Sequence, residues 1–149
     1  MLVSEILAIK GTVLYTVVPS STLGEAVATM TEQDIGSLVV FDAGQMVGML
    51  TFREVLRAVH RAGAGWMGCP VGEAMLADPQ VTHPDMDTSE LRRQMVTHHQ
   101  RYIPVMDGKV LLGVVSFHDV AKGELEEQGF ENRMLKNYIK HWPEQDDSA

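Results

Sequence analysis

The hydrophobic positions change their spacing several times along the chain, and each spacing predicts an element. β-Branched residues dominate positions 13–18, and continuous apolar runs occupy positions 37–41 and 46–50, so these three segments are expected to be strands. Helices are expected after Thr22, which opens a capping box, and from Phe52. Their apolar stripes at helical spacing are Leu23, Ala26, Val27 and Met30, then Phe52, Val55, Leu56 and Val59.

The same pattern occurs a second time further along the chain. Residues 48–54 read Gly-Met-Leu-Thr-Phe-Arg-Glu, and residues 113–119, at an offset of 65, read Gly-Val-Val-Ser-Phe-His-Asp. From Pro19 onward the two copies align without a gap, whereas the segments before Pro19 and Pro84 differ by three residues. The repeat predicts two equivalent units, each with the element order β-α-β-β-α.

The fold class that follows is α/β (α+β), with two pseudo-symmetric repeats whose three-stranded sheets pack against each other. The expected organisation is repeat 1 at residues 1–61, a glycine-rich linker at 62–70, repeat 2 at 71–123, a C-terminal helix at 124–143 and a mobile acidic tail at 144–149. The C-terminal helix carries an apolar stripe of Leu135, Tyr138, Ile139 and Trp142. Packing on its own domain is the first interpretation of this stripe, and an interface with a partner is the second.

Composition narrows the class of protein. Of the 149 residues, 45% are hydrophobic and 21% are charged, as in a folded domain rather than a disordered one. The formal net charge of −8 argues against general nucleic-acid binding, which requires clustered Lys and Arg. The single cysteine, Cys69, cannot form an intrachain disulfide, and no apolar run is long enough to span a bilayer. A cytoplasmic protein that does not insert into membranes is therefore expected.

The repeated motif combines features of an anion site. Thr51 and Ser116 stand where a strand gives way to a helix, and the N–H groups and dipole at a helix start attract anions. Three residues later, Glu54 and Asp119 either cap the helix or accept the hydroxyls of a sugar. A capped helix alone explains either copy, whereas the duplication favours a second interpretation, a ribose phosphate site present twice. The cations available to such a phosphate are Lys10, Arg53, Arg101 and His118.

The sequence offers little for metal binding or catalysis. His98 and His99 are adjacent and would point about 100° apart on a helix, so they do not converge on one ion. The chain has neither a nucleophile elbow nor a P-loop, and acids at a helix start stay ionised, which suits hydroxyl recognition better than proton transfer. We therefore expect no metal, no catalytic cofactor and no enzymatic activity.

These residues resemble a tandem pair of cystathionine β-synthase (CBS) domains. The resemblance rests on the paired β-α-β-β-α units, each ending in a glycine, two apolar residues, Ser or Thr, two further residues and an acid, and it covers residues 3–122. Within that family the chain is similar to the small stand-alone bacterial proteins. The segments that carry this closer similarity are residues 10–11, 35–36, 101–104 and 135–139.

The resemblance implies a flat homodimer that binds AMP, ADP, ATP, S-adenosylmethionine or NAD in four clefts between repeats. It assigns the hydroxyls of Ser116 and Thr51 to the phosphate side and Asp119 to the ribose. Glu54 stands where the family usually has Asp, so the two clefts are not expected to be equivalent. Also implied in ligand binding are Gly113 of the second motif and the segments that would flank the adenine, Thr16, Val17, Val18, Val81, Thr82 and His83.

The function predicted on this basis is regulatory. The chain would be an energy or redox sensor that binds an adenine nucleotide and signals to an unknown protein partner, because the sequence contains no effector domain. The alternative is a partner-binding or structural CBS module with degenerate clefts, which Glu54 and the C-terminal stripe favour. A nucleotide-converting enzyme is the third possibility. The choice among adenosine ligands stays open, because adenine is held mainly by backbone and apolar walls.

Overall fold

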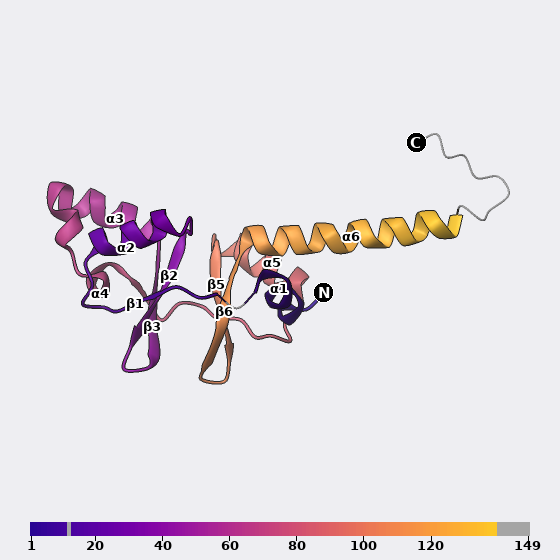
Figure 1. Ribbon diagram of the computed structural model, residues 1–149, viewed down its shortest axis with the longest axis horizontal. Coiled ribbons are helices and arrows are strands. Elements are labelled where there is room, and N and C mark those ends of the chain that lie inside the picture. Colours follow the sequence, from indigo (N-terminus) through magenta and orange to yellow (C-terminus); the bar gives the residue numbers. More distant parts are fainter. Residues whose placement is uncertain (12, 140–149) are drawn as a thin grey trace.

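The computed structural model describes residues 1–11 and 13–139, and it places two similar units side by side (Figure 1). The first unit contains β1 (Thr16–Val17), α2 (Leu23–Glu32), β2 (Ser37–Asp42), β3 (Gln45–Thr51) and α3 (Phe52–Ala62). The second contains α5 (Thr88–Thr97), β5 (Tyr102–Asp107), β6 (Val110–Ser116) and α6 (Phe117–Ile139). The remaining elements are α1 (Val3–Lys10), the 3₁₀ helix η1 (Gly63–Gly68), α4 (Val71–Ala74) and β4 (Leu76–Ala77).

The two hairpins have the same register. Strands β2 and β3 pair antiparallel with Ser37 opposite Thr51, and β5 and β6 pair with Tyr102 opposite Ser116. Both hairpins also shift register at the same relative point, after Val40 and after Val105. The predicted fold class, an α/β fold of two pseudo-symmetric repeats, is confirmed.

The two sheets differ in strand number, and the expectation of three strands in each is wrong. The first sheet has four strands in the order β1-β2-β3-β4, and the second has two, β5-β6. In the second unit the segment equivalent to β1 makes only an isolated parallel bridge, from Thr82 to Val105. Strand β4 was not predicted. It forms because α4 is only four residues long, which leaves Leu76 and Ala77 free to extend along the edge of β3.

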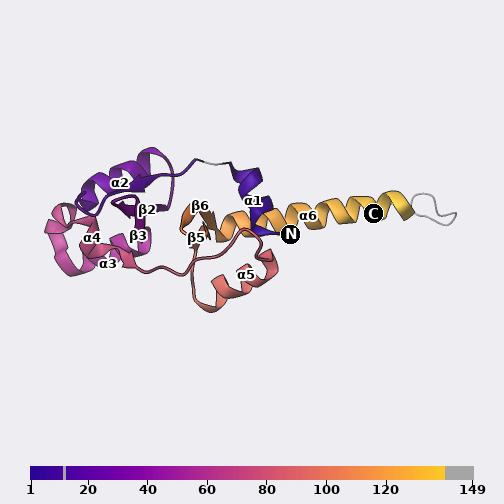
Figure 2. The same ribbon diagram turned by 90° about the horizontal axis from the view of Figure 1, so that it is seen from below.

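The short helices α1 and α4 each pack in the unit that they do not precede in the sequence. Val3 and Ile6 of α1 are buried in the core of the second unit, beside Leu91 and Ile103. Val71 of α4 is buried in the core of the first unit instead. Figure 2 shows the same arrangement, with α1 against α5 and α6 and with α4 near α2 and α3. Each hydrophobic core is therefore completed by a segment that precedes the other repeat in the sequence.

The glycine-rich segment between the repeats is not an open linker. Residues Gly63–Gly68 form η1, and Trp66 and Cys69 pack against the core of the first unit. The indole and thiol therefore anchor the connection to the first unit.

The apolar stripe predicted on α3 is divided, because Val55 packs against the first core whereas Leu56 and Val59 face outward. Leu56 is 63% exposed and Val59 is 36% exposed, whereas the face of α3 toward the core carries Ala58 and Glu54. An exposed stripe of this kind is available to a partner surface.

The last helix is continuous from the second unit to Ile139 and extends well beyond the other elements (Figure 1). Leu135 is 57% exposed, so this member of the C-terminal stripe does not pack on its own chain. The side chains of Tyr138 and Ile139, together with Trp142 and the acidic tail at 144–149, lie outside the described residues.

Candidate functional site

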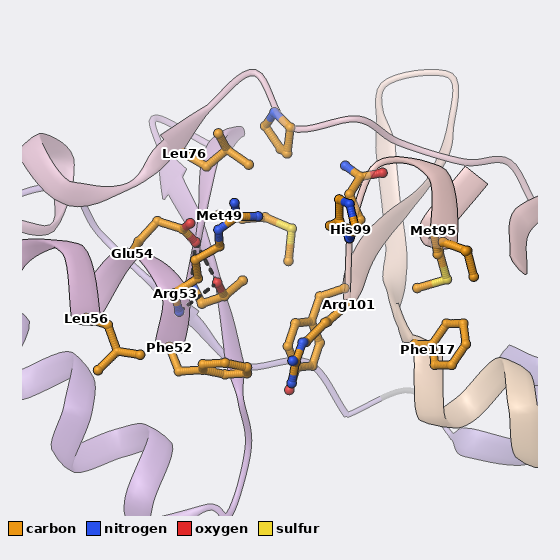
Figure 3. A pocket seen from close by; sticks show the side chains of 15 residues that line it. Met49, Phe52, Arg53, Glu54, Leu56, Leu76, Met95, His99, Arg101 and Phe117 are labelled. Atoms are coloured by element: carbon orange, nitrogen blue, oxygen red, sulfur yellow. Dashed lines mark hydrogen bonds between the residues drawn. The ribbon is translucent and has the colours of Figure 1, made fainter. Parts of the chain in front are cut away.

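Two cavities lie where the repeats meet, and each is built from both repeats. Cleft 1, of about 530 Å³, joins motif residues 51–54 of the first unit to residues 99–101 of the second (Figure 3). Cleft 2, of about 920 Å³, joins motif residues 116–118 of the second unit to residues 34–36 of the first. The clefts are related by the same offset as the repeats, and both volumes suit a small-molecule ligand.

Both motifs form capping boxes at the starts of their helices. Ser116 N–H donates to Asp119 Oδ2 at 2.9 Å, and Asp119 N–H donates to Ser116 Oγ at 3.0 Å. In the first motif the N–H and hydroxyl of Thr51 both donate to Glu54 Oε1, at 2.9 and 2.7 Å. The capping interpretation is therefore realised in both copies. It does not conflict with ligand contact, because Ser116 and Thr51 also line their clefts.

Asp119 is held by a cation from outside its own repeat. Lys10 Nζ donates to Asp119 Oδ2 at 2.6 Å and to the Val114 carbonyl at 2.8 Å. Burial acts to raise the pKa of Asp119, but the hydrogen bonds from Lys10 and from the Ser116 N–H outweigh it and hold the pKa below its ordinary value. Asp119 is therefore ionised at neutral pH and forms an ion pair with Lys10.

Glu54 has a different environment from Asp119. Its residue exposure is 6%, and its Oε1 atom accepts both hydrogen bonds from Thr51. Figure 3 shows Glu54 beside Arg53 at the wall of cleft 1. Glu54 is thus hydrogen-bonded to Thr51 at the start of its own helix, whereas Asp119 forms an ion pair with Lys10, which lies far away in the sequence.

Arg101, Tyr102 and Phe117 line both clefts and form the junction between them. The guanidinium carbon of Arg101 lies 5.2 Å from the centroid of the Phe52 ring, and Phe52 meets Tyr102 edge to face at 6.2 Å. Burial raises the pKa of Tyr102, partly offset by Arg101, so the phenol is a neutral donor at neutral pH. One cation and two aromatic rings, Tyr102 and Phe117, therefore serve both cavities, and the Phe52 ring lines cleft 1 alone.

The other predicted cations divide between the clefts. Arg53 lines cleft 1, whereas Lys10 and His118 line cleft 2. The structure thus brings each motif together with basic side chains, as a phosphate site requires.

Gly113 has a packing role. A Cβ atom there would lie 3.0 Å from Leu7 Cδ2, so the missing side chain lets α1 pack closely on β6. Its counterpart Gly48 is crossed by Met75 and Leu76 in the same way. Gly113 is buried and does not appear among the residues that line either cleft.

The segments expected to flank an adenine lie beside the clefts rather than in their walls. Thr82 is fully buried and bonds through its backbone to Pro104 and Met106, and Val17 packs against the first core. Of the predicted set, Thr16, Val17, Val18, Val81, Thr82 and His83 do not line either cleft. Residues a few positions upstream take that place: Leu14 and Tyr15 in cleft 2, Leu76 and Pro79 in cleft 1.

Some of the residues that line the clefts were not predicted from the sequence. Tyr102 and Phe117 read there as ordinary strand and helix residues, although each adjoins a predicted site residue. Gln100 lines cleft 1, and its buried Oε1 atom has no hydrogen-bond partner in the described part of the chain.

Within residues 1–11 and 13–139 no group of three or more His, Cys, Asp or Glu side chains is placed to hold a metal ion. Within the same residues no helix has both the length and the apolarity needed to cross a bilayer.

Comparison with known proteins agrees with the duplicated architecture. The family model for the CBS domain matches twice, at residues 3–61 and 71–126. The chain belongs to the CBS-domain family. It is similar to the CBS domain-containing protein YhcV of Bacillus subtilis, with 30% identity over 114 residues, which are 76% of this chain and 80% of YhcV.

Solved CBS structures superpose on most of this chain. The crystal structure of the CBS-domain containing protein ATU1752 from Agrobacterium tumefaciens has a TM-score of 0.80 and 32% identity, covering 83% of this chain and 99% of that one. The structure of CBSX2 in complex with AMP has a TM-score of 0.67 and covers 77% of this chain and 90% of that one. At 22% identity the second likeness shows the shared fold alone.

Proposed function

We propose that this CBS pair is a regulatory module that binds an adenine nucleotide between its repeats and signals to a protein partner. The observation that carries the proposal is the composition of the two clefts. Each is lined by a hydroxyl at a helix start, by basic side chains and by aromatic rings. The acid of the first motif, Glu54, also lines cleft 1, whereas Asp119 does not line cleft 2 and lies behind Ser116, to which it is hydrogen-bonded. A helix start and cations favour a phosphate, a carboxylate favours ribose hydroxyls, and apolar walls favour a base.

The ligand class follows from the same groups. AMP, ADP, ATP or NAD would place ribose hydroxyls near Asp119 and phosphate near Ser116, His118 and Lys10. CBSX2, which shares the fold, was solved with AMP, and this makes AMP the first ligand to test here. The module does no chemistry of its own in this proposal, so AMP, ATP and NAD should be recovered unchanged after incubation with the pure protein.

A thermal-shift panel tests the proposal directly. AMP, ADP, ATP, NAD, NADH and S-adenosylmethionine are added to the wild type, to Asp119→Ala and to Asp107→Ala, which alters an exposed acid at the end of β5. A ligand at 100 times its dissociation constant adds about 2.7 kcal/mol to the free energy of unfolding, which is several degrees for a chain of this size. We expect a shift that Asp107→Ala keeps and Asp119→Ala loses. A flat panel with folded protein would refute nucleotide sensing.

Cleft 1 gives the alternative its best support. Glu54 is nearly buried and already accepts two hydrogen bonds from Thr51, as in a helix start that needs no ligand. A partner-binding or structural module with degenerate clefts would show no shift in the panel. It would also show no ligand-dependent difference between wild type and Asp119→Ala.

We further propose a homodimer formed through the outer helices. Support comes from the apolar residues that face outward on α3 and α6, among them Leu56 at 63% and Leu125 at 67% exposure. Light scattering should give twice the chain mass of 16.5 kDa for the wild type and a lower mass for Leu56→Glu.

A further inference from the structure

Lys10 occupies a position in cleft 2 that has no lysine counterpart in cleft 1. It is the last residue of α1 and lines the cavity, with 37% of its side chain exposed. Its ammonium group binds Asp119 Oδ2 and the Val114 carbonyl at the same time. At this point the cleft therefore presents a cation to a ligand, with the carboxylate behind it.

The contact uses the carboxylate that the proposed function assigns to the ribose. Oδ2 of Asp119 accepts from both Lys10 and the Ser116 N–H, and the Asp119 side chain is 21% exposed. A ribose diol needs carboxylate lone pairs as acceptors. A diol that donates to both carboxylate oxygens competes with Lys10 for Oδ2. The displaced ammonium would need a new anion, because an unpaired charge in a half-buried site is costly.

Cleft 1 lacks this arrangement for a structural reason. The segment before the second repeat is three residues shorter, and when Val71 is matched with Val3 the residue opposite Lys10 is Asp78. There the chain turns, with φ of 50° at Asp78, and goes on toward Pro79. The carboxylate of Glu54 is bound to Thr51 instead of to a lysine. The two clefts therefore differ in charge as well as in volume.

We infer that Lys10 makes cleft 2 selective for a nucleoside that carries a phosphate on its ribose. The ribose hydroxyls take the place of the ammonium on Asp119, and the ammonium turns to the phosphate of the same ligand. One charged contact replaces another, so the exchange costs little for a nucleotide. A nucleoside without phosphate would leave Lys10 without an anion. This selectivity rests on the proposed function and adds to it the residue that distinguishes AMP from adenosine.

Calorimetric titration with adenosine and with AMP tests the role of Lys10. The proteins are the wild type, Lys10→Met, Lys10→Arg and Lys109→Met, which removes an equal charge from the exposed β5–β6 turn. In Lys10→Met the preference for AMP over adenosine should fall about tenfold or more, the effect of losing one hydrogen bond to a charged group. Adenosine binding should stay equal to that of the wild type or tighten, since Asp119 is no longer held. Lys10→Arg and Lys109→Met should keep the preference for AMP.

The possible failures are distinguishable. Equal weakening of AMP and adenosine in Lys10→Met would overturn the role of Lys10, because it would mean that the lysine only supports the fold of the cleft. No binding of AMP or adenosine to the wild type would overturn this inference, and it would overturn the proposed function as well only if the six-ligand thermal-shift panel is flat. If Lys10→Met does not fold, Lys10→Gln keeps donors for Asp119 and Val114 without the charge. The same loss of preference is expected there, and an unchanged preference would overturn the inference.

Discussion

Asp119 shows how one side chain serves folding and a candidate site together. Its carboxylate caps α6, pairs with Lys10 and lies just behind the wall of cleft 2. The pKa of Asp119 is held below its ordinary value, because the folded protein stabilises the ionised form more than the unfolded chain does. The contribution of Asp119 to stability is therefore complete above the ordinary pKa of 3.8 and is lost as the pH falls through the lower folded value.

The lowered pKa of Asp119 gives a prediction for the stability of Asp119→Asn. At neutral pH the variant should unfold more easily than the wild type, by about 1 kcal/mol or less, since a partly exposed ion pair is screened by solvent. Urea unfolding at pH values from 7 down to 2 should show this difference shrinking below the ordinary carboxyl pKa of 3.8. Asp107→Asn, at the exposed end of β5, serves as the control. A difference that grew on acidification would contradict the Lys10–Asp119 account.

At the scale of elements, two equivalent glycines set how closely a strand and its neighbours pack. A Cβ at Gly48 would lie 2.7 Å from the Leu76 carbonyl oxygen and 2.7 Å from Met75 Sδ. A Cβ at Gly113 would meet only the end of the Leu7 side chain, at 3.0 Å. The first site is closed by backbone, because β4 pairs with β3 there, and backbone cannot move aside as a side chain can.

The two alanine variants should therefore differ. Gly48→Ala should lower the free energy of unfolding by about 1–3 kcal/mol, the usual cost of overpacking. Gly113→Ala should cost less, since Leu7 can change rotamer. Gly65→Ala, where nothing lies within 4 Å of the added Cβ, is the control and should stay close to wild type. Denaturant unfolding measures all three, and equal losses at Gly48 and Gly113 would contradict the role of β4.

At the scale of the whole molecule, the exchange of α1 and α4 ties the two units together. Val3 is fully buried in the second core and Val71 in the first. Neither core is complete without a segment that precedes the other repeat, so the pair is expected to fold as one cooperative unit. The same arrangement places Lys10, at the end of α1, against the motif of the second unit.

Amide hydrogen exchange measured on two matched variants tests the crossed packing of α1 and α4. Val3→Ala should speed amide exchange first in β5 and β6, and Val71→Ala should speed it first in β2 and β3, because each substitution empties space in the core that it fills. Each should lower the free energy of unfolding by about 2 kcal/mol. Faster amide exchange in the repeat that each segment precedes, β2 and β3 for Val3→Ala or β5 and β6 for Val71→Ala, would refute the exchanged packing.

The sequence by itself determined the duplication, the hairpins and the starts of the motif helices. Apolar runs bounded by turn residues specify strands, and Thr51 and Ser116 specify helix caps, so local chemistry was sufficient there. It also identified Lys10, Arg53, Arg101 and His118 as basic residues near the motifs, and all four line a cleft.

Only the tertiary structure decided which segments meet. The pairing of motif 51–54 with residues 99–101, the exchange of α1 and α4, and the contact between Lys10 and Asp119 join residues far apart in the chain. The pairing of β4 with β3, and the place of Leu14, Tyr15, Leu76 and Pro79 in the cleft walls, likewise depend on which segments lie against each other. Spacing along a sequence reports the local period of an element, whereas contacts between elements depend on how the buried faces fit together.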